Sequence, residues 1–293
     1  MRNLCLIFLG CAMVLTACGS PASAQPSTAG NPKTIEDIGS DTIVNLALAW
    51  AEAYQKVNPA VRISVSGGGT GTGMAALINK TTDIANASRK IKDEEKQNAR
   101  KNGVEPYEIE IARDAIGVIV NPENPVQQLT LQQVSDIYSG KITNWKEIGG
   151  EDRTIVLLSR ESNSGTHVYF LEQVVRLGNR QDKTLFSPDT LLLPSSEGIM
   201  AEVRQNPNAI GYDGLGYITP DVKTLAVAPQ DGGEYVRPSI ETVNNAKYPI
   251  ARPLFMYTSG EPQGEVKTYL DWILGPEGQK IVGQLGFVPL QQK

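Results

Sequence analysis

Two strand–loop–helix units, far apart in the sequence, constrain the fold of this chain most strongly. In the first, an alternating segment at 61–65 runs into a Gly-rich loop at 67–73, and a helical apolar stripe follows. In the second, the segment 154–159 runs into small polar residues at 162–166, and a helix is predicted over 168–177. With a further helix predicted over 41–54, the chain alternates strands and helices. This alternation predicts an α/β protein with a parallel sheet, built as two lobes around a shared cleft.

Three loops rich in Gly, Ser and Thr, at 39–42, 69–73 and 162–166, each join a predicted strand to a predicted helix. Backbone N–H groups at a helix start lack intrahelical partners, and the helix dipole places partial positive charge there. Glycine allows close approach of the backbone, and hydroxyl groups add donors, so the three loops together predict an anion-binding site. Each loop alone has a simpler interpretation, because Ser, Thr and Asp are common N-cap residues.

Two arginines stand beside these loops. Arg89 and Arg160 each follow a predicted strand, at positions where an open α/β sheet presents ligand contacts. Taken alone, each arginine is better explained by a surface ion pair.

The N-terminus has the pattern of an export signal. Arg2 precedes a short apolar run, which ends in Leu15-Thr16-Ala17-Cys18 and resembles a bacterial lipobox. We therefore expect a signal peptide at 1–18, a lipid on Cys18 and a flexible tether at 19–33. The protein would be extracytoplasmic, periplasmic or at the cell surface, and lipid-anchored to the membrane. Ordinary cleavage at the Ala-x-Ala sequence at 22–24 is the alternative.

Composition argues against several classes of function. The net charge of −5, with no basic cluster free of acidic neighbours, argues against nucleic acid as a partner. The body has one histidine, His167, and no cysteine after Cys18, so we expect no metal, no cofactor and no catalytic group. His167 is interpreted as a first-turn helix residue.

Several motifs resemble those of the phosphate-binding proteins of Pst-type ABC transporters, in the same order and over nearly the whole mature chain. The resembling stretches are 87–89, 131–145, 160–166, 208–212, 252–254 and 275–278. The resemblance implies a periplasmic-binding-protein fold of type II, with the ligand cleft between two lobes and two interdomain crossings. Domain I would comprise 34–111 plus 250–293, and domain II 112–249.

The same resemblance implies that the chain is not an enzyme. It would capture inorganic phosphate and deliver it to the permease subunits of an ABC importer. The family motifs place the ligand contacts on Ser40, Thr42, Thr70, Ser88, Arg89, Arg160, Ser164, Gly165 and Thr166.

The chain departs from the family pattern at two positions. One branch of the family has an Asp, which accepts the proton of the ligand, where this chain has Arg89. The third loop is usually Asp-Gly-Ser-Gly-Thr but here is 162–166, Ser-Asn-Ser-Gly-Thr. The carboxylate that accepts the proton is therefore open, with Asp41 the first candidate and Glu161 the second. Asp41 is also interpretable as a plain N-cap.

Three other functions stay open. The same scaffold binds other oxyanions, such as sulfate or molybdate, or organic phosphates, because a fold does not decide the ligand. A phosphate-ester hydrolase and an adhesion or sensor lipoprotein are the remaining alternatives.

Overall fold

The computed structural model describes residues 33–291. The signal peptide, Cys18 and nearly all of the tether predicted above lie outside these residues. Within the described part of the chain, no helix is both long and apolar enough to cross a membrane.

Nine strands of the described residues form one mixed sheet, in the order β2-β1-β3-β11-β4-β8-β6-β7, with β9 also paired to β4. The strands are β1 (Lys33–Gly39), β2 (Val61–Ser66), β3 (Ile84–Ala87), β4 (Pro106–Val120), β6 (Val156–Arg160), β7 (Leu191–Leu193), β8 (Ala209–Gly214), β9 (Lys223–Thr224) and β11 (Ala251–Ser259). A separate pair joins β5 (Gln128–Thr130) to β10 (Ala226–Ala228). Pairing is parallel among β1, β2 and β3 and among β6, β7 and β8, as the alternating sequence predicts.

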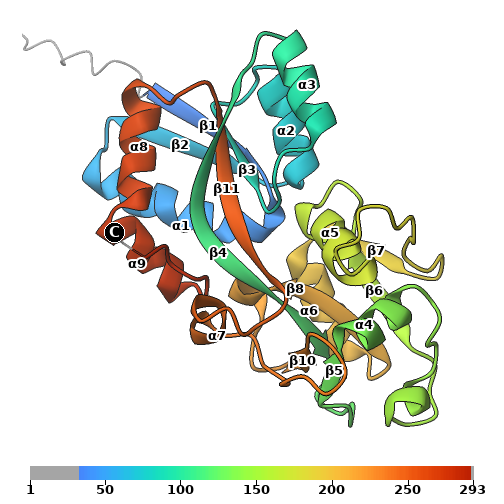
Figure 1. Ribbon diagram of the computed structural model, residues 1–293. Coiled ribbons are helices and arrows are strands. Elements are labelled where there is room, and N and C mark those ends of the chain that lie inside the picture. The colour runs from blue at the N-terminus through green and yellow to red at the C-terminus, as the bar shows by residue number, and fades with distance from the viewer. Residues whose placement is uncertain (1–32, 292–293) are drawn as a thin grey trace, which may run out of the picture. The chain divides into compact units, whose positions relative to one another are not determined.

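Helices cover both faces of the β1–β3 half of the sheet (Figure 1). On one face lie α1 (Asp41–Val57), α8 (Gly264–Leu274) and α9 (Pro276–Gln284), and on the other α2 (Thr70–Ile78) and α3 (Asp93–Lys101). The apolar stripe of α1, including Ile43 and Leu46, is fully buried against the sheet. Trp50 on that stripe donates from Nε1 to the carbonyl of Gly278 in α9, at 2.8 Å.

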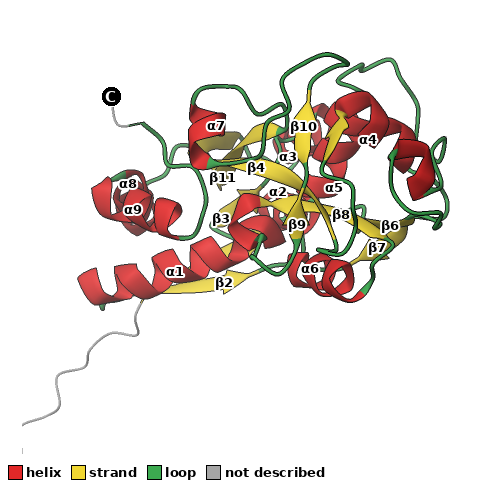
Figure 2. Ribbon diagram, turned by 90° about the horizontal axis from the view of Figure 1, so that it is seen from below, coloured by secondary structure: helices red, strands yellow, loops and turns green. Residues whose placement is uncertain are grey.

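The β6–β8 half has its own helices. On one face α6 (Ser196–Gln205) packs Ile199 and Val203 against the sheet, and on the other lie α4 (Leu131–Tyr138) and α5 (Gly165–Phe170). Phe170 stacks on Tyr212 with ring centroids 3.6 Å apart. Figure 2 shows α6 and α4 on opposite sides of β6 and β8. The remaining elements are α7 (Ile240–Asn244), the 3-10 turns Trp145–Ile148 and Leu215–Tyr217, and a π-helical turn, Leu171–Val175.

One long strand, β4, is common to both halves. Its residues 106–115 pair with β11, whereas Ile116–Val120 pair with β8. In Figure 1 β4 and β11 run side by side out of the first half, and β4 continues into the second. The predicted α/β fold class is thereby confirmed. The domain boundaries near 111 and 250 stay a prediction, although the partner change of β4 lies close to the first of them.

The segment 168–177 differs from the single helix that its periodicity predicts. The α-helix ends at Phe170 and a π-helical turn follows. Val174 and Val175 are both buried there. The π turn lies at the end of the predicted helix, so too few residues follow it for a shift in the 3.6-residue pattern to be recognised.

Candidate functional site

The first and third of the predicted loops meet at the start of α1. The hydroxyls of Thr42 and Thr166 lie 2.7 Å apart, although these residues are 124 positions apart in sequence. Both side chains are buried, and so is Ser40, whose backbone N–H donates to the carbonyl of Asn86 at 3.0 Å. The loop before α1 is therefore fixed against β3 on one side and against the start of α5 on the other.

The second loop meets the third as well. The N–H of Gly71 donates to the carbonyl of Asn163 at 2.9 Å, and the Asn163 amide donates back to the carbonyl of Gly68 at 2.8 Å. Gly68 has φ 109° and Gly69 has φ 91°, a region of backbone conformation that favours glycine. The Gly-rich composition of this loop thus has a geometrical reason, because its backbone makes the contacts.

Thr70 of the second loop, Gly165 of the third loop and the neighbouring Ser88 are tightly packed against one another. The Thr70 and Ser88 hydroxyls lie 3.3 Å apart, and both side chains are fully buried. A Cβ atom on Gly165 would lie 2.3 Å from the Thr70 hydroxyl oxygen and 2.5 Å from that of Ser88. Only a glycine at 165 allows the start of α5 to approach these two hydroxyls.

Arg160 connects the two halves through Asp41. Its Nη2 donates to Asp41 Oδ2 at 2.7 Å, and Asp41 Oδ1 accepts the N–H of Gly68 at 2.9 Å. On the other side, Nη1 of Arg160 donates to the Ser196 hydroxyl at 2.9 Å, which in turn donates to Asp213 at 3.0 Å. The Arg160 side chain is 1% exposed, so this ion pair is screened far less than a surface pair.

Arg252 on β11 supplies a second buried guanidinium group to the candidate site. It donates to Asp114 Oδ2 through Nε and Nη2, at 3.2 and 2.9 Å. It also donates to the carbonyl of Ser88 at 3.0 Å and to the Thr166 hydroxyl at 2.9 Å. Burial raises the pKa of Asp114 above its ordinary value, and the facing guanidinium of Arg252 opposes that rise.

Most of the predicted site residues therefore come together. Ser40, Asp41, Thr42, Thr70, Ser88, Arg160, Ser164, Gly165 and Thr166 all belong to the three loops or to their immediate contacts. Arg89 follows Ser88 but points elsewhere, since its guanidinium binds both carboxylate oxygens of Glu95 in α3, at 2.7 and 2.8 Å. Glu161, the second candidate for the proton acceptor, is exposed.

Four buried residues at this place were not among the predicted site residues, namely Arg252, Asp114, Ser196 and Asp213. Only Arg252 left a sequence signal, since it begins one of the resembling stretches. The other three reach the site through contacts with residues far away in sequence, which no local pattern reveals.

His167 takes part in a separate contact. Its Nδ1 lies 3.0 Å from the Ser159 hydroxyl, which lies 2.6 Å from the hydroxyl of Tyr212. The neighbouring Ser164 hydroxyl instead accepts the N–H groups of Thr166 and His167, as an N-cap does. Burial lowers the pKa of His167, so the ring is neutral at pH 7.

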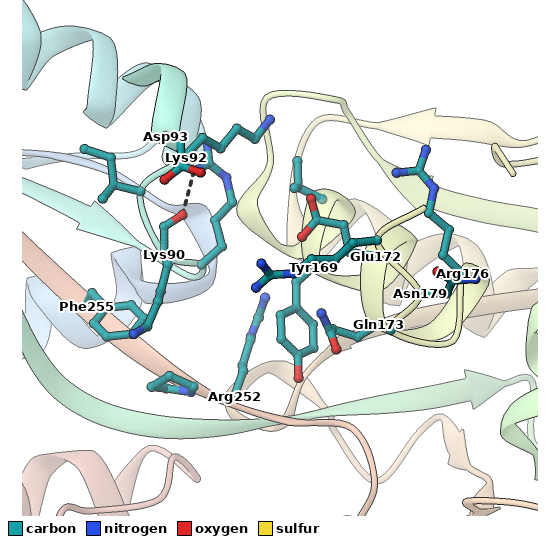
Figure 3. Close-up of a pocket in the computed structure, with 16 residues that line it drawn as sticks. Lys90, Lys92, Asp93, Tyr169, Glu172, Gln173, Arg176, Asn179, Arg252 and Phe255 are labelled. Carbon is teal, nitrogen blue, oxygen red and sulfur yellow. Dashed lines mark hydrogen bonds between the residues drawn. The ribbon is translucent and has the colours of Figure 1, made fainter. Parts of the chain in front are cut away.

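A groove of about 660 Å³ lies beside these loops, between the segment 89–93 and the α5–π-turn segment. Figure 3 shows Lys90, Lys92 and Asp93 on one side and Glu172, Gln173 and Arg176 on the other, with Arg252 and Tyr169 between them. Because Arg252 also contacts Ser88 and Thr166, the groove ends at the wall of the candidate site.

The fold and this site define a class of protein, the binding proteins of the PBP superfamily. The family model described as a PBP superfamily domain matches residues 23–277. A phosphate-binding protein PstS from Pseudomonas aeruginosa is 32% identical, over 97% of this chain and 92% of its own length. PstS from Bacillus subtilis is 30% identical, over 98% and 93% of the two chains.

Solved structures agree with these relatives. A Clostridium perfringens structure, described as a phosphate ABC transporter substrate-binding protein with bound phosphate, is 35% identical with a TM-score of 0.78. It covers 88% of this chain and 100% of that one. An ABC-type phosphate transport receptor from Vibrio cholerae is 26% identical, with a TM-score of 0.69 and coverages of 88% and 100%. The chain therefore belongs to the PstS family of phosphate-binding proteins.

Proposed function

We propose that this protein captures inorganic phosphate at the junction of the three loops and delivers it to the permease subunits of an ABC importer. One observation carries the proposal. Hydroxyl, backbone and guanidinium donors from both halves of the body converge on one buried place, where Thr42, Thr166 and Arg252 are joined by hydrogen bonds. The names of the relatives support phosphate as the ligand.

The donors suit a tetrahedral oxyanion. Each Ser or Thr hydroxyl rotates freely enough to redirect its hydrogen from a neighbouring side chain to a ligand oxygen. Arg160 and Arg252 add charged guanidinium N–H groups, which are strong hydrogen-bond donors to oxyanions. We place the ligand contacts on Ser40, Thr42, Thr70, Ser88, Arg160, Ser164, Gly165 and Thr166, add Arg252, and expect Arg89 to contact phosphate only if it leaves Glu95.

Asp41 stays our first candidate for the carboxylate that recognises the phosphate proton. Phosphate carries a proton at neutral pH and sulfate carries none, so a carboxylate in the site accepts a hydrogen bond from one and repels the other. Asp41 is held by Arg160 inside the site, whereas Glu161 is exposed.

The proposal includes two lobes that close on the ligand. The lobes are 34–111 with 250–293, and 112–249, and the polypeptide crosses between them in β4 and before β11. The partner change of β4 next to Ile116 supports a hinge near the first crossing.

We also propose that the protein works outside the cytoplasm and is tethered through a lipid on Cys18. The lipobox-like sequence at 15–18 supports this. The unchanged protein should be found in the membrane fraction, and Cys18→Ala should be lost from it. Equal amounts of the two proteins in the membrane fraction would contradict the lipid anchor.

Isothermal titration with phosphate, sulfate and molybdate tests the ligand, and Arg160→Ala tests the site. We expect phosphate to bind most tightly and Arg160→Ala to weaken it by tens- to thousands-fold, because loss of a buried charged contact costs about 2–5 kcal/mol. Arg153→Ala is the matched control, since Arg153 is exposed and pairs with Glu151. Equal affinities for the three anions, or an unchanged Arg160→Ala, would contradict the proposal.

We also propose that the protein is not an enzyme, and a turnover assay tests this directly. We expect no release of p-nitrophenol from p-nitrophenyl phosphate, with or without divalent metal ions. Turnover that disappears in Ser164→Ala would favour the hydrolase instead.

A further inference from the structure

The candidate site holds more negative than positive charge before any anion arrives. Arg160 and Arg252 are each 1% exposed and form ion pairs with Asp41 and Asp114. Asp213 is a third carboxylate next to them and is fully buried. Two guanidinium groups therefore face three carboxylates, and if all are ionised the cluster carries one net negative charge. A phosphate ion would add to that charge in a largely buried region, which is costly.

Asp213 differs from the other two carboxylates in its partners. Asp41 and Asp114 each bind a guanidinium directly, whereas Asp213 reaches Arg160 only through the Ser196 hydroxyl. Its Oδ1 accepts that hydroxyl at 3.0 Å and the N–H of Gly214 at 2.7 Å. Its Oδ2 is buried and has no hydrogen-bond partner among the described residues. A buried carboxylate oxygen without a donor is stabilised when it carries a proton.

We propose that Asp213 takes up one proton when phosphate binds, so that ligand affinity is linked to proton uptake. The inference deepens the proposed function and rests on it. The proton goes from solvent to Oδ2 of Asp213 and forms an O–H bond, while the bound anion keeps its own charge. The cluster with its ligand then has one negative charge fewer than it would otherwise have.

The surroundings of Asp213 support this assignment. Burial raises the pKa of Asp213 to about 6, and Arg160, Gly214, Ser196 and Arg252 oppose the rise. Asp213 is therefore mostly ionised at pH 7.5 without ligand and lies close to its titration range. The charged and titratable groups that face it from the packed elements are Arg160 of β6, Arg252 of β11, Asp114 of β4, Asp41 of α1, Tyr212 of β8 and Tyr217 of the 3-10 turn.

Burial raises the pKa values of the two tyrosines, so both stay neutral from pH 5 to 8. Asp41 and Asp114 are less suited to take up the proton, since each would lose a direct ion pair with an arginine. An anion that approaches this cluster raises the pKa of Asp213 further, because like charges disfavour ionisation.

Titration calorimetry with phosphate at pH 7.5, in buffers of different ionisation enthalpy, measures the proton uptake. We expect up to one proton for the unchanged protein and a clearly smaller number for Asp213→Asn. The control is Asp231→Asn, which removes the same charge from an exposed loop and should leave the uptake unchanged.

Affinity measured from pH 5 to 8 gives the second readout. The two proteins should bind alike at pH 5, where Asp213 is protonated. At pH 8, two pH units above 6, Asp213→Asn should bind up to about 100-fold more tightly, because the unchanged protein must first protonate its carboxylate. The ionisation of phosphate itself affects both proteins equally and cancels in this ratio.

Ser196→Ala provides a separate test if Asp213→Asn does not fold. The hydroxyl of Ser196 holds the pKa of Asp213 down, so its removal should move the pH of greatest proton uptake upward. An uptake profile that does not change in Ser196→Ala would overturn the inference. So would equal uptake by Asp213→Asn and the unchanged protein, or weaker binding by Asp213→Asn at every pH. A protein that does not bind phosphate at any pH would instead overturn the proposed function, which is a distinguishable result.

Discussion

At the scale of single residues, the buried and half-buried carboxylates of this protein differ in whether an arginine pairs with them. Asp41 and Asp114 each have one, but Asp37 on β1 has none among the described residues. Asp37 is fully buried, and neither of its oxygens accepts a hydrogen bond of good geometry within that part of the chain. Burial raises its pKa to about 7, and nearby Asn86 opposes the rise. Below about pH 7 the folded protein therefore holds a proton on Asp37.

This raised pKa predicts a pH dependence of stability. The folded state holds the Asp37 proton more tightly than the unfolded chain, so the free energy of unfolding falls as pH rises from about 4 through 7. Asp37→Asn removes the ionisation. We expect this variant to raise the free energy of unfolding at pH 8 by at most about 4 kcal/mol. At pH 4 the free energy of unfolding should be nearly unchanged.

Urea unfolding at the two pH values checks this, with exposed Asp231→Asn as the control. Destabilisation by Asp37→Asn at pH 8 would show that the ionised carboxylate has a partner in the folded protein.

At the scale of elements, the start of α5 determines how closely the halves approach. Gly165→Ala would place a methyl group 2.3 Å from the Thr70 hydroxyl oxygen, and both neighbouring side chains are fully buried. Overpacking of this kind costs about 1–3 kcal/mol. We expect phosphate affinity to fall by roughly 5- to 100-fold, while each half keeps its own core.

The matched control for this prediction is Gly283→Ala in α9, where a Cβ would lie 3.4 Å from Pro289, an ordinary contact. Both variants are compared by phosphate titration and by melting temperature without ligand. If Gly165→Ala binds phosphate normally, the close approach of α5 is not needed for binding.

Local patterns in the sequence were sufficient to predict several of the elements. The stripe of α1 and the alternation of β2 are local and complete, so both elements form where expected. The three loops were found for the same reason, since glycine and hydroxyl residues mark them in sequence. The contacts between Arg160 and Asp41, and between Arg252 and Asp114, join residues 119 and 138 positions apart. Such pairs form only in the folded protein, and no local pattern in one sequence reveals them.

At the scale of the whole molecule, the hydrogen bonds between the loops would correspond to the closed state of the two proposed lobes. Thr42 with Thr166 and Gly71 with Asn163 both join segments that the proposed lobes separate. Opening of the proposed lobes must break these hydrogen bonds. A ligand that contacts both lobes favours the closed state and so compensates for the cost of closing. We expect X-ray scattering to give a smaller radius of gyration with phosphate than without it.

Arg160→Ala serves as the control for the scattering measurement. At a phosphate concentration that saturates the unchanged protein but not this weaker-binding variant, the radius of gyration of the variant should not change. An identical radius for the unchanged protein with and without phosphate would mean that the two lobes do not move on binding.

The shared strand β4 has a consequence for attempts to study the halves separately. Residues 106–115 complete the first sheet region through β11, and Ile116–Val120 complete the second through β8. A cut near 111 would divide β4 between the two fragments. In each fragment, backbone N–H and C=O groups that are paired in the centre of the intact sheet would lose their partners. Exposed edges of that kind recruit other chains. Fragments cut there should aggregate at concentrations at which the intact protein remains dispersed.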